Sequence, residues 1–327
     1  MDGTAIRYVG AQALATPAPR VPPPAALAVL DSLADQQGGL VLWSQAVGAG
    51  LSAAQARTLI RTGEWVRLRH GVLVRSAEAG SAPPHFLECA ARWMSLPGDV
   101  VLSHESAAVL HGFDLIGVPE EPTFTITRQR RGALRSPGVG KLLADERTTL
   151  QGIPITSRER TLSDVLRAAA SRARAQELAD QGARLGVPPA GMRSVLHRQV
   201  GWPGIVQARE AWAHASALSE SPLESRCRVW FRDGGLPEPE QQVAVADRRG
   251  VFARVDFLFR EHRTVVEADG RVKYDDPDAL WKEKRREDRL RDQRLEVVRA
   301  TWADGQDGGR DLVARVQRAF GRAERAA

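Results

Sequence analysis

Three acidic residues lie in or beside the most hydrophobic part of the chain, between residues 250 and 270. Asp256 interrupts the apolar run 255–259, while Glu267 and Asp269 follow two consecutive valines. Two strands joined by the polar residues 260–263 would form a hairpin, in which Asp256 and Glu267 stand nearly opposite each other. Burying an unpaired carboxylate costs on the order of several kcal/mol, so these acids need a cation.

A shared divalent metal would satisfy both acids at once. Two carboxylate oxygens, a backbone carbonyl and water suit Mg²⁺ (or Mn²⁺), which keeps much of its hydration. Two other arrangements are open. The acids can face solvent on an edge strand, or they can pair with arginines from elsewhere in the chain.

A further carboxylate, Glu224, belongs to a helix predicted over residues 221–233. Ser221 is the expected N-cap, Pro222 takes the first helical position, and two glycines end the helix. Glu224 falls at the edge of the apolar face, where it could reach a neighbouring site. The Ser-Pro-Leu-Glu sequence is also a capping box, which needs the glutamate for purely local reasons.

The elements near the N-terminus predict a different activity. Residues 1–24 are rich in proline and are expected to form a flexible arm. Helices are predicted over 25–39, over 40–50 and over 51–63, where Ser52 and Gln55 form a capping box, and a basic hairpin follows over 64–76. Three helices and a hairpin predict a winged helix-turn-helix that binds DNA. Its candidate DNA contacts are Arg57, Arg61, Arg67 and Arg69.

Between these two parts, residues 81–175 are expected to be an α+β region and residues 176–219 a helical connector. A second capping box, Thr156 with Glu159, is expected to open a helix. The basic, acid-free run 128–141 is either solvated or lies along phosphates. His104 and His111, seven residues apart without a third ligand, fit packing or surface roles better than metal binding.

The composition restricts the class of protein. With 327 residues, several domains are expected, and a formal charge of +6 makes a polyanionic partner plausible. Two cysteines cannot form a disulfide framework, and neither a membrane span nor a secretory signal is expected. The sequence therefore predicts a cytoplasmic protein.

Two resemblances sharpen these expectations. The N-terminal run from "GLVLWSQAVGAG" to "RHGVLVRS", with "LSHESAAVLHGF" and "PITSRERTLSDVLR", resembles the AbiEi-like antitoxin of type IV abortive-infection systems, a winged-helix repressor. That resemblance implies DNA and a toxin or a second copy as partners, and a role in phage defence. Residues 220–320 resemble the very-short-patch-repair-like (Vsr-like) branch of the PD-(D/E)XK endonucleases, which implies a mixed central sheet flanked by helices.

The second resemblance assigns roles to particular residues. It implies Mg²⁺ held by Asp256, Glu267 and the Ala268 carbonyl, with Glu224 orienting a metal-bound water. Asp269 stands where the superfamily has its lysine. Lys273, or Lys284 on the following helix, would then steady the developing charge.

Three functions compete. The chain is a Mg²⁺-dependent endodeoxyribonuclease positioned by its winged helix, or an antitoxin-like repressor whose nuclease-fold domain is inactive. The third alternative is a nucleic-acid-binding scaffold with a structural metal.

Overall fold

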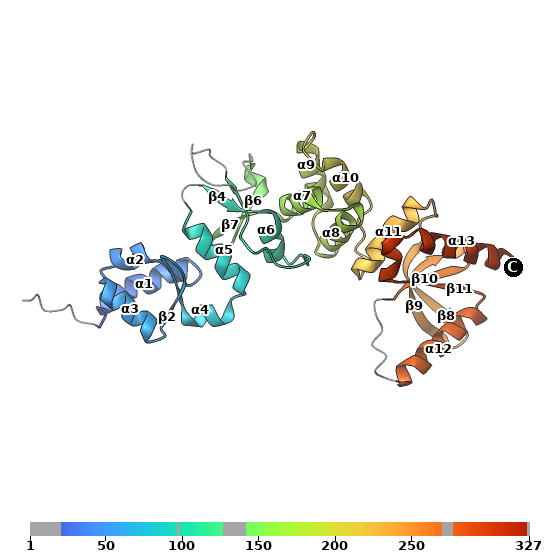
Figure 1. Cartoon of the computed structure of the whole chain (residues 1–327), viewed down its shortest axis with the longest axis horizontal. Coiled ribbons are helices and arrows are strands. Elements are labelled where there is room, and N and C mark those ends of the chain that lie inside the picture. The colour runs from blue at the N-terminus through green and yellow to red at the C-terminus, as the bar shows by residue number, and fades with distance from the viewer. Residues whose placement is uncertain (1–20, 97–98, 127–141, 270–276, 326–327) are drawn as a thin grey trace, which may run out of the picture. The chain divides into compact units, whose positions relative to one another are not determined.

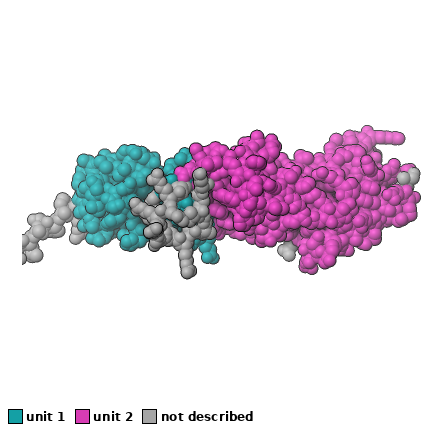
Figure 2. All heavy atoms as spheres, turned by 90° about the horizontal axis from the view of Figure 1, so that it is seen from above, with its two compact units in different colours: residues 1–102, 120–141, 148–155 teal, residues 103–119, 142–147, 156–327 magenta. Residues whose placement is uncertain are grey.

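The chain combines helices with three sheets in the parts that the computed structural model describes, residues 21–96, 99–126, 142–269 and 277–325 (Figure 1). It divides into two compact units. Unit 1 comprises residues 1–102, 120–141 and 148–155, and unit 2 comprises residues 103–119, 142–147 and 156–327 (Figure 2). The architecture is therefore α+β and built in several parts.

The N-terminal elements of unit 1 pack around one small sheet of strand order β1-β3-β2. Residues 40–42 are a strand rather than the start of a helix, because Leu40 pairs with Val74 and is fully buried. The Ser52–Gln55 capping box opens α3 as predicted, and Gly71 (φ +80°) allows the tight hairpin turn. The elements are α1 (Pro24–Gln36), β1 (Leu40–Leu42), α2 (Trp43–Gly48), α3 (Ala53–Arg61), β2 (Trp65–Arg69), β3 (Val72–Arg75) and α4 (Ser76–Ser81).

A second sheet has the strand order β5-β4-β7-β6. It follows α5, a helix whose Phe86, Cys89 and Ala90 are buried. Its elements are α5 (Pro84–Met94), β4 (Val100–Leu102), β5 (Phe124–Ile126), β6 (Arg147–Leu150) and β7 (Ile153–Thr156). The basic run 128–141 lies outside the described residues.

Unit 2 begins with a group of helices whose apolar faces form one core, including Leu162, Leu178, Met192 and Ala208. The expected cap at Thr156 is wrong, because Ser157 accepts the Arg160 amide hydrogen bond and Thr156 belongs to β7. The elements are α6 (His104–Leu110), η1 (Ala144–Glu146), α7 (Arg158–Ala168), α8 (Arg172–Arg184), α9 (Pro189–Arg198) and α10 (Ile205–Ala213).

The C-terminal part of unit 2 is a mixed four-stranded sheet of order β11-β10-β9-β8, in which β10 and β11 are parallel and the other neighbours antiparallel. Phe257 and Val266 share a core with α11 and α13, while Val255 and Val265 share another with Leu290 of α12. Helices therefore cover both faces. The elements are α11 (Pro222–Asp233), β8 (Glu240–Asp247), β9 (Gly250–Phe259), η2 (Arg260–His262), β10 (Thr264–Ala268), α12 (Pro277–Asp292), β11 (Glu296–Ala300), η3 (Trp302–Asp307) and α13 (Arg310–Arg325).

A buried ion pair joins these two parts of unit 2. Arg228 on α11 donates to both Asp180 oxygens on α8, each at 3.0 Å, and the side chains are 6% and 0% exposed. Asp180 also accepts the Ser216 amide and the Gln176 side chain. Because α11 carries Glu224, helix α8 helps to fix the position of that carboxylate.

Candidate functional site

The N-terminal arginines form one candidate site on α3 and the following hairpin. Leu59 and Ala56 bury one face of α3, and Arg57 and Arg61, four residues apart, are exposed on another. Arg67 on β2 is also exposed, and its guanidinium carbon lies 5.7 Å from the centre of the Trp43 ring. These three guanidinium groups are accessible to a polyanion.

Arg69 is placed differently from the other three predicted arginines. A register shift between Arg67 and Arg69 interrupts the alternation of the hairpin. Arg69 is half-buried and donates to Glu88 of α5 at 3.3 Å. Its charge is therefore partly neutralised within unit 1.

The C-terminal acids converge on a cavity of about 200 Å³. The antiparallel pairing of β9 and β10 runs through Val266 and Phe257, so Glu267 and Asp256 come next on their strands, as predicted. Asp256 accepts a hydrogen bond from the Ala268 amide at 2.8 Å. The residues that line the cavity are Arg254, Asp256, Glu267, Ala268, Asp269, Arg286 and Arg299.

Glu267 pairs with an arginine from another element, which is one of the alternatives to a metal. Arg286 of α12 donates to both Glu267 oxygens at 2.7 Å in a bidentate pair, and Glu267 is 9% exposed. The guanidinium therefore holds the oxygens that the sequence assigns to a metal. A divalent cation at this carboxylate would have to displace Arg286.

Glu224 and Asp256 are linked through a residue that sequence reasoning missed. The side-chain nitrogen of Gln242 on β8 donates to Glu224 at 2.9 Å and reaches Asp256 at 3.4 Å. Burial raises the pKa of Glu224 against the lowering effect of the Glu220 amide, and the charge of Asp256 raises it further. Ser221 caps α11 as predicted, but the Glu224 carboxylate accepts from Glu220 and not from the N-cap amide.

Gln242 is unusual in two further respects. Its backbone lies in the left-handed region (φ +53°), which is strained for a residue with a side chain. Its buried side-chain oxygen has no hydrogen-bond partner among the described residues. The signal in the sequence is weak, because "EQQVAV" shows only a pair of glutamines before a short apolar run. Strand β8 itself was not predicted.

The remaining residues predicted for this site are Asp269, Lys273 and Lys284. Asp269 lies 3.5 Å from Arg299, which also binds Glu287. Lys273 lies outside the described residues, and the Lys284 nitrogen lies 5.6 Å from the centre of the Trp281 ring. In the described parts of the chain, no group of three or more His, Cys, Asp or Glu side chains is arranged to hold a metal. The Mg²⁺ site stays a prediction.

His104, at the start of α6, and His111, just after its end, each have a hydrogen-bond partner. His104 contacts the Ser103 hydroxyl at 2.9 Å, and His111 lies 2.8 Å from the Thr156 carbonyl. Burial lowers the pKa of His111, and the carbonyl opposes that effect. Within the described ranges, no helix has the length and apolar character needed to cross a membrane.

Comparison with known proteins finds a similar family for a segment of the N-terminal part. Residues 29–75, which include α3 and the hairpin, match the family described as "Transcriptional regulator, AbiEi antitoxin". The resemblance of residues 220–320 to nucleases stays a prediction from their sequence pattern.

Two relatives extend over most of the chain. Both are uncharacterized proteins of Mycobacterium tuberculosis, one from strain CDC 1551 / Oshkosh and one from strain ATCC 25618 / H37Rv. Each is 28% identical over 282 residues, which cover 84% of this chain and 100% of the relative. The alignment therefore extends well beyond the segment that matches the regulator family.

Proposed function

We propose that this protein is a DNA-binding transcriptional regulator of the antitoxin type. The observation that carries the proposal is the coincidence of two features in residues 29–75. The segment matches the antitoxin-type regulator family, and it displays Arg57, Arg61 and Arg67 on α3 and the adjoining hairpin. An exposed cluster of guanidinium groups is suited to phosphate contacts.

In this proposal residues 25–80 form a winged helix-turn-helix. Helix α3 lies in the major groove, and the β2–β3 hairpin is the wing that lies along the backbone. Arg57 and Arg61, on one side of α3, contact phosphates or base edges, while Arg67 contacts the backbone from the wing. Arg69 contributes less, because Glu88 already holds its guanidinium.

The partners follow from the same proposal. DNA is the first, and the antitoxin resemblance adds a toxin or a second copy of this chain. Phage defence is the physiological setting that this class implies.

A reporter assay tests the regulator. The DNA upstream of the gene drives a reporter in cells that express the full-length chain or its Arg57→Ala/Arg61→Ala/Arg67→Ala variant. The control variant is Arg248→Ala/Arg249→Ala, which removes two exposed arginines from unit 2. Repression by the wild type and the control, lost in the triple variant, supports the proposal. Equal reporter output in all strains refutes it.

The cavity of the C-terminal sheet favours a second candidate, a Vsr-like endonuclease. Asp256, Glu267 and Asp269 line one cavity. The side-chain nitrogen of Gln242 joins Glu224 to Asp256, and the side-chain oxygen of Gln242 has no hydrogen-bond partner among the described residues. Oxygen donors of this kind suit Mg²⁺, which Asp256, Glu267 and the Ala268 carbonyl would hold. When bound, the ion lowers the pKa of water and stabilises charge on a phosphate.

The residues around the cavity would have defined parts in such a reaction. Burial raises the pKa of Glu224, so its carboxyl group is better suited than an exposed one to hold a proton. Gln242 would orient Glu224 and Asp256, and Lys273 would steady charge on the phosphate. Arg286 must first release Glu267.

Nuclease activity is tested with purified full-length protein, plasmid and linear duplex DNA, and Mg²⁺ or Mn²⁺. Asp256→Asn should reduce cleavage on the order of a thousandfold, because the variant keeps its size but loses the charge that a hard cation needs. The matched control is Glu240→Gln, an exposed carboxylate of the same sheet. If the wild type cleaves nothing while it still binds DNA, the regulator stands without the enzyme.

A further inference from the structure

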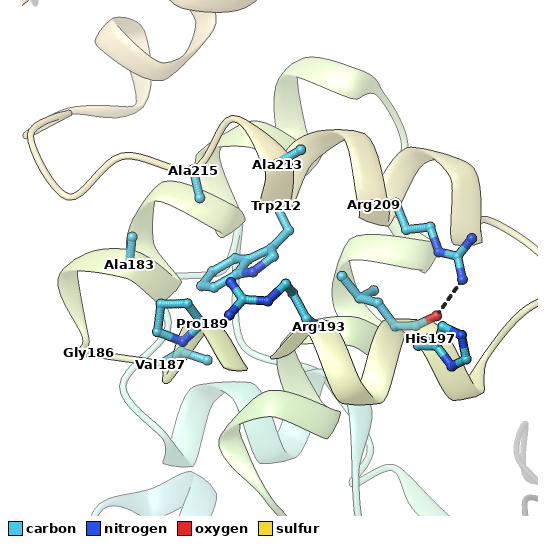
Figure 3. Close-up of a pocket in the computed structure, with 11 residues that line it drawn as sticks. Ala183, Gly186, Val187, Pro189, Arg193, His197, Arg209, Trp212, Ala213 and Ala215 are labelled. Atoms are coloured by element: carbon cyan, nitrogen blue, oxygen red, sulfur yellow. Dashed lines mark hydrogen bonds between the residues drawn. The ribbon is translucent and has the colours of Figure 1, made fainter. Parts of the chain in front are cut away.

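Unit 2 contains a large groove that neither the regulator nor the nuclease uses. It has a volume of about 760 Å³ and lies between α8, the turn after it, α9 and the end of α10 (Figure 3). Volumes of about 300–1,000 Å³ are typical of sites for small organic molecules. The residues that line it are Ala183, Gly186, Val187, Pro189, Arg193, Leu196, His197, Arg209, Trp212, Ala213 and Ala215.

The groove is apolar along most of its length. Val187 and Leu196 are buried, Trp212 is half-buried, and alanines and Pro189 complete the surface. An aromatic ring beside small aliphatic side chains provides contact area for a flat ring or an alkyl chain. The lining therefore selects a ligand with a substantial hydrophobic part.

The ionisable side chains of the groove are all basic. Arg193, His197 and Arg209 are exposed, and none of the eleven lining residues is acidic. Arg209 donates to the Leu196 carbonyl at 3.0 Å, which fixes its guanidinium at one end of the groove (Figure 3). Arg193 points toward the end formed by Trp212 and Pro189 (Figure 3). A ligand whose hydrophobic part packs on the apolar side chains of the groove can therefore place a single negative charge on Arg193 or Arg209.

We propose that this groove binds a small amphipathic organic acid, with its ring or alkyl chain against Trp212, Val187 and Leu196 and its acidic group on Arg193 or Arg209. A protein partner fits less well, because a standard protein interface needs roughly 20–30 residues a side and the groove offers eleven. The inference does not depend on DNA binding or on nuclease activity.

The test uses the full chain and 1-anilinonaphthalene-8-sulfonate, a fluorescent aromatic anion, in direct titration. Decanoate and the neutral decanol then compete with the bound probe. Saturable binding with one site, displaced at least tenfold more effectively by decanoate than by decanol, is expected. No saturable binding, or equal displacement by the two competitors, overturns the proposal.

Two variants locate the site. Arg193→Gln/Arg209→Gln should weaken probe binding at least tenfold, while Arg248→Gln/Arg249→Gln, which removes two exposed charges from the β8–β9 turn, should change it less than twofold. Ala213→Trp, at an exposed position of α10, should block the groove without altering the core. If both Arg193→Gln/Arg209→Gln and Ala213→Trp bind the probe like the wild type, the ligand lies elsewhere and the proposal is overturned.

Discussion

Removing the carboxylate of Asp180 should destabilise unit 2 more than any surface change nearby. In Asp180→Ala the Arg228 guanidinium remains 6% exposed and loses the two 3.0 Å hydrogen bonds to its counter-ion. Breaking one side of a buried ion pair costs about 3–5 kcal/mol, because the remaining charge stays desolvated. The Ser216 amide and the Gln176 side chain lose an acceptor as well.

Urea unfolding of the full chain, monitored by hydrogen exchange in α8 and α11, measures this loss of stability. With a slope of about 1–3 kcal/mol per molar urea, the midpoint of these helices should fall by on the order of 1 M or more. The control is Asp233→Ala, because Asp233 pairs with Arg172 at 3.0 Å with both side chains about half exposed. An exposed pair of this kind contributes about 0–1 kcal/mol.

A second variant separates the charge from the packing. Asp180→Leu/Arg228→Met removes both charges, so it should recover most of the stability that Asp180→Ala loses. If Asp180→Ala costs no more than Asp233→Ala, the buried pair does not hold α8 and α11 together, and our account of how Glu224 is positioned is wrong.

Three further predictions concern individual side chains. The pKa of Glu224 is raised in the folded protein, so wild type loses stability as the pH rises above about 4.5 and this carboxyl group ionises. Glu224→Gln lacks that loss. Its free energy of unfolding, measured by urea titration, should therefore rise relative to wild type between about pH 4.5 and 7. His111 has a lowered pKa, so wild type should lose stability as pH falls below about 6.5, and His111→Gln should show a smaller slope, measured by thermal unfolding across that range. Ser52→Ala removes the acceptor of the Gln55 amide hydrogen bond, so it should lower the free energy of unfolding of unit 1 by about 1 kcal/mol in denaturant. The control is Ser81→Ala, which removes a hydroxyl group that does not cap a helix.

Local signals in the sequence predicted most of the elements. The capping residues Ser52 and Ser221, the turn at Gly71 and the hairpin around residues 260–263 depend on neighbours a few residues away, and the structure has these features. The error at residues 40–42 has a tertiary cause, because that segment is a strand only through its pairing with β3.

The partners of the candidate site could not be predicted in the same way. Arg286 is 19 residues from Glu267 in the sequence, and Arg228 is 48 residues from Asp180. Gln242 acts through a strained backbone on a strand that was not predicted. Such contacts depend on the register and packing of whole elements, which the local pattern does not specify.

The salt dependence of DNA binding tests the regulator most directly. Fluorescence anisotropy gives the dissociation constant of the full chain on duplex DNA from its upstream region, at salt concentrations from about 50 to about 300 mM. In a plot of the logarithm of the binding constant against the logarithm of the salt concentration, each phosphate contact contributes about 0.9 to the slope. Replacing Arg57, Arg61 and Arg67 with alanine should weaken binding and reduce that slope by about 0.9 for each of them that contacts a phosphate, up to about 2.7. Arg69→Ala should reduce the slope by less than about 0.9. Wild-type binding that is absent at low salt, or a slope that the triple variant leaves unchanged, would contradict the account.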